Sequence, residues 1–440
     1  MFRLLEIARP WPGFFMSLFC AKSRKMHLEP LMSIGNLCLP MENNMKKLAL
    51  AGALALSSTL ALAGGHAKEV KLGVVLGFTG PAESLAESMA RGAELAMKEV
   101  SESGLLLDNA TVSHVRADST CTDASAAAAA AERVVSSDKV DAIIGALCSG
   151  ATISILQNVA MPKGVLLFSP SATSPALSTL EDNDLFFRVS PSDARQGQII
   201  AELLQEKGFD SIAMTYTNND YGKGLADTIQ SNFEAAGGKV NIVAPHEDEK
   251  GDYSAEVAAL AQAGGDILVV VGYLDKGGKG IIQASIDTGA FDQFYLPDAM
   301  IGDSLVEAIG PDLNGSIGTV PGSDSEGAQI YADLAKRDGF EAGPYSPEAY
   351  DAAALTLLAM QAANSKEGSA ASAKIFDVAN APGTPILPGE LAKALQILKD
   401  GGEIDYVGAT AVELIGGGES AGIYREILID GGEITTVQFR

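Results

Sequence analysis

The sequence has few of the residues that most often carry catalysis or bind metal ions. Its 440 residues include only 4 histidines, 4 cysteines and 1 tryptophan, and the histidines are widely scattered. Basic residues are also scarce, since 31 of them stand against 56 acidic residues and the net charge is −25. A chain this acidic repels nucleic acid and anionic membranes. We therefore expect a protein that uses no metal and no cofactor and that has no nucleic-acid partner.

Long apolar runs are also missing, except for one close to the N-terminus. Met45 is followed by Lys46 and Lys47, and then by an apolar stretch over residues 48–63 with small-residue cleavage patterns at 61–63 and 65–67. The stretch is shorter than the roughly 20 residues that a membrane span needs. These features predict a secretory signal peptide over residues 45–67 and a periplasmic location. We expect residues 1–44 to be foreign to the mature protein, with the true start at Met45; the alternative is a genuine extended leader.

Two cysteines remain once residues 1–67 are removed. The remaining chain has 24 basic and 53 acidic residues, a net charge near −29, and it keeps Cys121 and Cys148. In an oxidising compartment such a pair is expected to form a disulfide bond. A metal site is the weaker alternative, because no cluster of histidines accompanies the two cysteines.

Strand and helix patterns alternate along the rest of the chain. Val70–Leu76 has the apolar pattern of a buried strand, and a helical pattern follows over Leu85–Val100. The alternation continues to about residue 169 and restarts at Leu185–Val189. It predicts an α/β fold with parallel sheets covered by helices. Beyond residue 320 the patterns are mostly helical, with one helix expected over Ala370–Asn380, and a final hairpin is expected around residues 430–432.

Two α/β units followed by a helical return segment predict two lobes between which the chain crosses three times. The crossings are expected near Val189–Asp193, Thr319–Ser323 and Gly416–Tyr424. The N-terminal lobe then comprises residues 68–189 and 321–416. The C-terminal lobe comprises residues 190–320 and 417–440.

Two loops of the first unit carry neutral polar groups where ligands of open α/β sheets bind, beyond the carboxyl ends of the strands. The loop at 145–152 brings Ser149 to the start of a helix, and the loop at 170–175 carries Ser171, Thr173 and Ser174. Hydroxyl and backbone N–H groups at such positions suit a carboxylate. The alternative is that Ser149 and Ser174 only cap helices.

Several longer motifs carry a family resemblance. They are KLGVVLGFTGP, GALCSGAT, FSPSATSPAL, NNDYGKGLADT, VVVGYLDKGGKGIIQAS and PEAYDAA. With these motifs, over about residues 70 to 430, the chain resembles the leucine/isoleucine/valine-binding proteins, the periplasmic receptors of branched-chain amino-acid ABC transporters. The resemblance implies a type I periplasmic binding protein fold, in which two doubly wound parallel-sheet lobes on a three-strand hinge close on a zwitterionic ligand. It also implies a monomer that delivers an amino acid to an inner-membrane ABC permease.

The resemblance assigns roles to both of the polar loops. Ser149 and Thr173 match the residues that bind the ligand carboxylate in the family. Ser171, with Ala172 beside it, lies where a backbone carbonyl accepts a hydrogen bond from the ligand ammonium.

Four further residues complete the site that the resemblance implies. Tyr221 and Tyr273 match tyrosines that close over the ligand, and Asp298 lies where the family places a glutamate against the ammonium. Leu85 stands where the family has an aromatic lid. The leucine in place of an aromatic residue and the aspartate in place of a glutamate leave the preferred ligand side chain open. The alternatives are packing for the two tyrosines and a solvated loop position for Asp298.

Other functions fit the sequence less well. Ser149 has no histidine base nearby, no G-x-G-x-x-G follows the first strand, and residues 277–280 lack the spacing of a phosphate-binding loop. We therefore expect no enzyme. A ligand-sensing module and a receptor for amides or aromatic acids are the remaining alternatives. A simple aromatic acid is disfavoured, because it would leave Asp298 without a partner.

Overall fold

The structure is a computed structural model that describes residues 68–440. The expected leader and signal peptide, residues 1–67, lie outside the described residues. The described part contains two seven-stranded sheets and a small sheet of two strands. Within it no helix combines the length and the apolar character needed to cross a membrane.

The first sheet has the strand order β13-β14-β5-β4-β3-β1-β2, and its strands β1 to β5 run parallel. Strands such as β3 and β4 are apolar and buried along their whole length, as expected for a sheet with helices on both faces. Its strands are β1 (Glu69–Leu76), β2 (Thr111–Asp118), β3 (Ala142–Gly145), β4 (Leu166–Ser169), β5 (Phe186–Pro191), β13 (Leu414–Ile415) and β14 (Glu419–Ser420).

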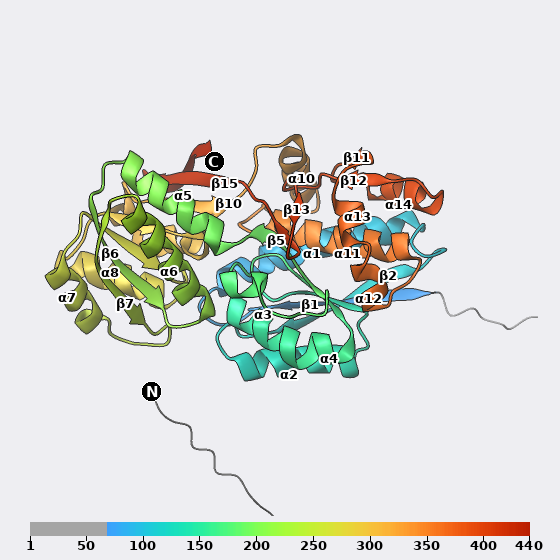
Figure 1. The fold of residues 1–440 in the computed structure, drawn as a ribbon, viewed down its shortest axis with the longest axis horizontal. Helices are drawn as coiled ribbons and strands as arrows, with labels where there is room; N and C mark the ends of the chain where they lie inside the picture. Colours follow the sequence, from blue (N-terminus) through green and yellow to red (C-terminus); the bar gives the residue numbers. More distant parts are fainter. Residues whose placement is uncertain (1–67) are drawn as a thin grey trace, which may run out of the picture. The chain divides into compact units, whose positions relative to one another are not determined.

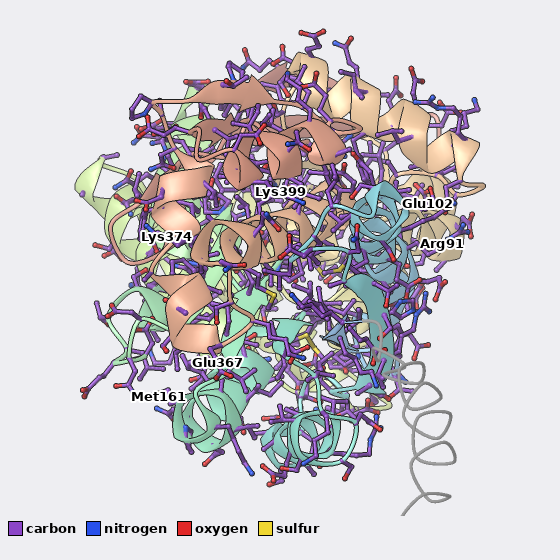
Figure 2. All side chains as sticks on the ribbon, turned by 90° about the vertical axis from the view of Figure 1, so that its right-hand side faces the viewer. Arg91, Glu102, Met161, Glu367, Lys374 and Lys399 are labelled. Carbon is purple, nitrogen blue, oxygen red and sulfur yellow. A yellow bond between two sulfur atoms is a disulfide. The ribbon has the colours of Figure 1, made fainter. Side chains whose placement is uncertain are left out.

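We call this sheet and the helices that pack on it the first lobe (Figure 1). Helix α11 is buried on nearly every side and packs against α1 and the sheet, while charged side chains such as Glu102, Glu367 and Lys399 are exposed (Figure 2). The helices are α1 (Glu83–Ser103), α2 (Ala124–Ser136), α3 (Ser149–Ile155), α4 (Met161–Lys163), α10 (Glu326–Arg337), α11 (Ser346–Ala363), α12 (Gly368–Ser372), α13 (Ile375–Ala379) and α14 (Leu391–Lys399), with the small sheet of β11 (Thr384–Ile386) and β12 (Ile404–Tyr406).

The second sheet has the order β16-β15-β10-β9-β8-β6-β7, and with its helices it forms what we call the second lobe (Figure 1). Asp430 pairs with Glu433 across an antiparallel turn, which confirms the expected hairpin. The strands are β6 (Ser211–Thr217), β7 (Lys239–His246), β8 (Ile267–Val271), β9 (Phe294–Leu296), β10 (Ile317–Pro321), β15 (Tyr424–Asp430) and β16 (Glu433–Phe439), and the helices are α5 (Asp193–Glu206), α6 (Asp220–Ala235), α7 (Ser254–Ala263), α8 (Gly277–Thr288) and α9 (Asp303–Ile309).

The chain passes between the two sheets after β5, after β10 and after β14. Strand β14 pairs with β5 of the first sheet, so the last passage lies between Ser420 and Tyr424. This lies within the crossing expected near Gly416–Tyr424 and a few residues beyond the lobe boundary expected at residue 416. The reason is that Gly417 and Gly418 have positive φ angles of 83° and 69° and form the turn between β13 and β14. The glycines therefore serve a hairpin rather than the passage itself.

The helix expected over Ala370–Asn380 is wrong as a single element. Two short helices, α12 and α13, take its place. The break follows Ser372, whose buried hydroxyl donates a hydrogen bond to the backbone carbonyl of Asp184 in the first lobe. A tertiary contact of this kind leaves no periodic signal in the sequence.

Candidate ligand-binding site

The first polar loop joins β3 to α3 and presents Ser149. Cys148, not Ser149, is the N-cap residue of α3, and the Ser149 hydroxyl instead accepts a hydrogen bond from the Ser174 backbone N–H at 3.1 Å. The capping alternative therefore does not describe Ser149. It does describe Ser174, whose hydroxyl accepts from the Ala176 N–H at the start of the 3-10 turn Pro175–Ser178.

The second polar loop follows β4 and is braced against the first. The Ser171 hydroxyl donates to the Leu147 carbonyl at 2.8 Å, so this side chain serves the loop rather than a ligand. The buried Arg188 donates from Nη1 to the carbonyls of Ala172 and Ser174, at 3.1 and 2.9 Å. The Thr173 hydroxyl is buried and has no hydrogen-bond partner among residues 68–440. Thr173 is thus the side chain of this loop with unused hydrogen-bonding capacity.

The expected disulfide bond is present. Cys121 lies in the loop between β2 and α2, Cys148 directly precedes α3, and their Cα atoms are 5.2 Å apart. The bond ties the Ser149 loop to the neighbouring strand connection. The first polar loop is therefore held in place by a covalent bond as well as by hydrogen bonds.

The second lobe contributes Asp298 and two tyrosines. Asp298 begins the short 3-10 turn after β9 and is only 1% exposed, and its Oδ1 accepts a hydrogen bond from the Tyr221 hydroxyl at 2.7 Å. Tyr221 lies at the start of α6, where the Asn219 side chain accepts from the Gly222 N–H. The Tyr273 ring stacks on the Tyr221 ring with 5.4 Å between centroids. The structure therefore brings these three expected residues together, and the solvated loop position for Asp298 is wrong.

A residue that the sequence reasoning missed completes this cluster from the other lobe. The Tyr345 hydroxyl donates to Asp298 Oδ2 at 2.5 Å, and Tyr345 directly precedes α11 of the first lobe. Tyr345 is 47 residues from Asp298 in sequence and lies in a Gly-Pro-Tyr-Ser-Pro segment with the pattern of a plain loop. Its positive φ of 61° is the structural signal that marks it as unusual.

Asp193 was also missed as a site residue. It is the first residue of α5, it is completely buried, and neither of its carboxylate oxygens has a hydrogen-bond partner within residues 68–440. Gln196 Oε1 and the Tyr424 hydroxyl are likewise buried and without partners in the described part. The sequence places Asp193 at an expected crossing, and in the structure it stands at a helix start, where an acid is commonplace. Buried polar atoms without partners are rare enough that several in one region indicate a place for a polar ligand.

The electrostatics of the region are dominated by the two buried acids. Burial raises the pKa of the Asp298 carboxyl, and the hydrogen bonds from Tyr345 and Tyr221 oppose that shift. Burial, and then the negative charge of Asp298, raise the pKa of Asp193 well above its usual range, while the Arg188 charge opposes the shift. A cationic group between the two acids would favour their ionised forms. The region therefore suits a ligand with an ammonium group.

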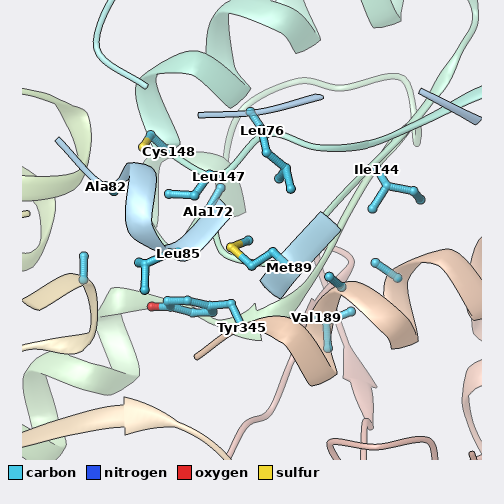
Figure 3. Close-up of a cluster of buried hydrophobic side chains, with 14 of the residues drawn as sticks. Leu76, Ala82, Leu85, Met89, Ile144, Leu147, Cys148, Ala172, Val189 and Tyr345 are labelled. Atoms are coloured by element: carbon cyan, nitrogen blue, oxygen red, sulfur yellow. The ribbon is translucent and has the colours of Figure 1, made fainter. Parts of the chain in front are cut away.

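The expected lid residue lies in an apolar cluster. Leu85, in the first turn of α1, is buried together with Met89, Leu147, Ala172 and Tyr345 (Figure 3). A methyl group placed on Gly302 of the second lobe would lie 3.6 Å from Leu85 Cδ2. The first turn of α1 therefore meets the second lobe at the site.

Comparison with known proteins shows the family and the fold. A family model described as periplasmic binding protein matches residues 69–386. The Leu/Ile/Val-binding protein of Citrobacter freundii is 32% identical over 281 residues, which cover 63% of this chain and 74% of that protein. Among solved structures, a leucine-binding protein from Thermotoga maritima has a TM-score of 0.71 at 20% identity, over 84% of this chain and 98% of that one. A solute-binding protein from Rhodopseudomonas palustris in complex with benzoate has a TM-score of 0.67 at 17% identity, over 84% and 96%.

The two open α/β sheets, their interleaved connections and the family match confirm the expected type I fold. The family model covers well over half of the chain, and the Citrobacter relative is covered over more than two thirds of its length. The chain therefore belongs to the periplasmic binding protein family, together with the Leu/Ile/Val-binding proteins.

Proposed function

We propose that this chain is the receptor of an ABC importer and that it captures an α-amino acid with an apolar or other neutral side chain. The observation that carries the proposal is the buried Asp298 carboxylate, which Tyr221 of the second lobe and Tyr345 of the first lobe both bind. An ammonium group brings a positive charge and three N–H donors to this carboxylate and to the partnerless oxygens of Asp193.

The two polar loops of the first lobe support a carboxylate. Ser149 and Thr173 offer neutral hydroxyls from the two braced loops, and the Thr173 hydroxyl is buried without a partner among the described residues. A buried charge costs several kcal/mol unless it is paired or hydrogen-bonded. The buried acids answer the ammonium of a zwitterion, and the neutral hydroxyls of the two loops answer its carboxylate. The apolar cluster around Leu85 and Tyr345 suits an apolar side chain on the same ligand.

The benzoate complex of the Rhodopseudomonas palustris neighbour makes an aromatic acid the second candidate. Such a ligand has a carboxylate but no donor for the oxygens of Asp193. An amide ligand would supply N–H donors but no positive charge between the two buried acids. The amino acid is therefore favoured by charge as well as by hydrogen bonding.

The remaining parts of the proposal concern the secretion of the protein, its oligomeric state and its transport partner. We propose that residues 45–67 direct secretion, that residues 1–44 are not part of the mature protein, and that the two lobes open and close as a monomer. The ligand is released unchanged to an inner-membrane permease. Receptor relatives and the family match support this setting in preference to a catalytic one.

A thermal-shift screen of the purified mature chain tests the ligand class. The panel contains apolar and polar L-amino acids, their amides, benzoate and 4-hydroxybenzoate. A ligand at 1,000 times its dissociation constant adds about 4 kcal/mol to the free energy of unfolding. We expect L-leucine, L-isoleucine or L-valine to give a large shift, with a dissociation constant on the order of micromolar or below in calorimetry. A shift with the aromatic acids alone would replace this proposal by the second candidate.

A further inference from the structure

Asp275 of the second lobe makes a set of contacts with the first lobe that the ligand site does not use. It lies between β8 and α8, two residues after Tyr273. Its Oδ2 accepts a hydrogen bond from the Ser84 backbone N–H at 2.9 Å, and its own N–H donates to the Pro81 carbonyl at 3.0 Å. Its Oδ1 accepts from the Ser304 hydroxyl at 2.8 Å, and that hydroxyl lies 3.0 Å from Ser84 Oγ. One side chain therefore joins the start of α1 to two elements of the second lobe.

Helix α1 has no cap of its own at this end. Its N-cap residue is Ala82, which has no side-chain acceptor, and Ser84 occupies the second helical position. The first N–H groups of a helix have no partner inside the helix, and a carboxylate near them is favoured by the helix dipole. Asp275 supplies that carboxylate from the opposite lobe. The helix is capped in this way only while the two lobes are in contact.

The capped turn also carries the lid. Leu85 directly follows Ser84, and a methyl group placed on Gly302 of the second lobe would lie 3.6 Å from its Cδ2. Leu274, the residue before Asp275, donates its N–H to the Ala299 carbonyl in the turn that begins with Asp298. The contacts of Asp275 are thus linked to the lid residue Leu85 through Ser84, and to the turn that begins with Asp298 through Leu274.

We propose that Asp275 is a positioning residue for ligand capture: by capping α1 across the lobes it holds them closed and keeps Leu85 over the ligand. The kinetic part of this inference rests on the proposed function, because it concerns the release of an amino acid. The structural part, closure itself, does not depend on the ligand. When the lobes part, water must replace the carboxylate at the Ser84 N–H. The contact therefore slows the opening of the lobes more than it changes the rate at which the ligand associates.

The experiment compares Asp275→Ala with Asp287→Ala as the matched control. Asp287 is an exposed acid on α8, and among residues 68–440 its side chain accepts a hydrogen bond only from Gln283 of the same helix. Small-angle scattering of ligand-free protein should give a larger radius of gyration for Asp275→Ala than for the wild type and the control. Ser304→Ala removes one of the two partners of the carboxylate and should have an intermediate effect. Because these residues lie at the surface between the lobes, the melting temperatures should stay close to that of the wild type.

The second measurement is stopped-flow binding with L-leucine as the probe. Asp275→Ala should release leucine roughly three- to tenfold faster with an unchanged association rate, the effect of about one helix-terminal hydrogen bond. An unchanged radius of gyration in Asp275→Ala overturns the proposal. A wild type that binds no amino acid, with a larger radius in the variant, overturns the proposed ligand class and supports the role of Asp275 in closure.

Discussion

The two buried acids of the site, Asp193 and Asp298, differ from the buried base Arg188 in whether a side chain of opposite charge pairs with them. Arg188 is surrounded by acceptors, because it donates to the carbonyls of Ala172 and Ser174 and pairs with Glu419. Its charge is paired with Glu419 of β14, and its N–H groups hold the second polar loop. Asp193 and Asp298 have no comparable basic partner in the described part of the chain. A ligand that brings its own positive charge completes the site.

Replacement of Asp298 by alanine tests directly whether the ligand supplies the positive charge that the site lacks. We expect Asp298→Ala to weaken the binding of leucine by at least about 30-fold, because truncating one partner of a buried charge pair costs about 2 to 5 kcal/mol. The deaminated analogue 4-methylpentanoate should lose much less, since it presents no ammonium. Isothermal calorimetry with both ligands gives the comparison.

The matched control for this variant is Asp292→Ala. Asp292 is an exposed acid in the loop before β9, so its loss changes the net charge equally without touching the site. It should bind both ligands as the wild type does. Equal losses for leucine and 4-methylpentanoate in Asp298→Ala would show that the carboxylate does not face the ammonium.

At the scale of elements, the site depends on loops that are held by bonds between residues far apart in sequence. The disulfide between Cys121 and Cys148 fixes the Ser149 loop, and the Ser171 and Arg188 hydrogen bonds fix the neighbouring one. These loops need little rearrangement to receive a carboxylate. Such order before binding reduces the entropy lost on association.

Loss of the disulfide is expected to affect stability and binding together. The double variant Cys121→Ser/Cys148→Ser should lose about 3 kcal/mol in the free energy of unfolding, because the unfolded chain regains the freedom that the loop closure removes. Its affinity for leucine should fall as the Ser149 loop loosens. Urea unfolding with and without reductant measures the first effect and calorimetry the second. Reductant should change the wild type only, and free thiols at Cys121 and Cys148 in exported wild-type protein would contradict the prediction.

The sequence predicts the helices and strands better than it predicts the tertiary contacts between them. The β3 and β4 loops were found because ligands bind at the carboxyl ends of parallel strands, a rule that needs only the strand pattern. Tyr345 and Asp193 were missed because each joins the site through a crossing or a return segment. Their side chains become special only when distant parts of the chain are brought together. The break between α12 and α13 was missed for the same reason.

At the scale of the whole molecule, buried acids make stability depend on pH. Burial raises the pKa of the Glu348 carboxyl to about 8, and its Oε2 has no hydrogen-bond partner among residues 68–440. The folded chain thus keeps this proton to a higher pH than the unfolded chain, in which a glutamate ionises near 4.3. The stabilising contribution is present below that lower value and is lost as the pH rises through about 8.

We therefore expect the melting temperature of the wild type to fall between pH 6.5 and pH 9. Glu348→Gln keeps the position neutral at every pH, so it should remove part of this fall and melt about 2 °C or more above the wild type at pH 9. Burial lowers the pKa of His246 to about 4, and its titration opposes this trend only at lower pH. Differential scanning calorimetry across this window measures the effect.

The control for this measurement is Glu307→Gln, which neutralises an exposed acid on α9. It should follow the pH profile of the wild type. Parallel profiles for Glu348→Gln and the wild type would show that Glu348 does not hold its proton in the folded chain.

The interleaving of the two sheets has a consequence for the biogenesis of the protein. The first sheet takes its edge from β13 and β14, whose residues 414–420 come more than 220 positions after β5. A chain that emerges from its N-terminus therefore cannot finish either lobe until nearly all of it is available. A fragment that ends after β10 would expose the unpaired edges of β5 and β10, which are templates for aggregation. Neither half of the chain is consequently expected to fold on its own.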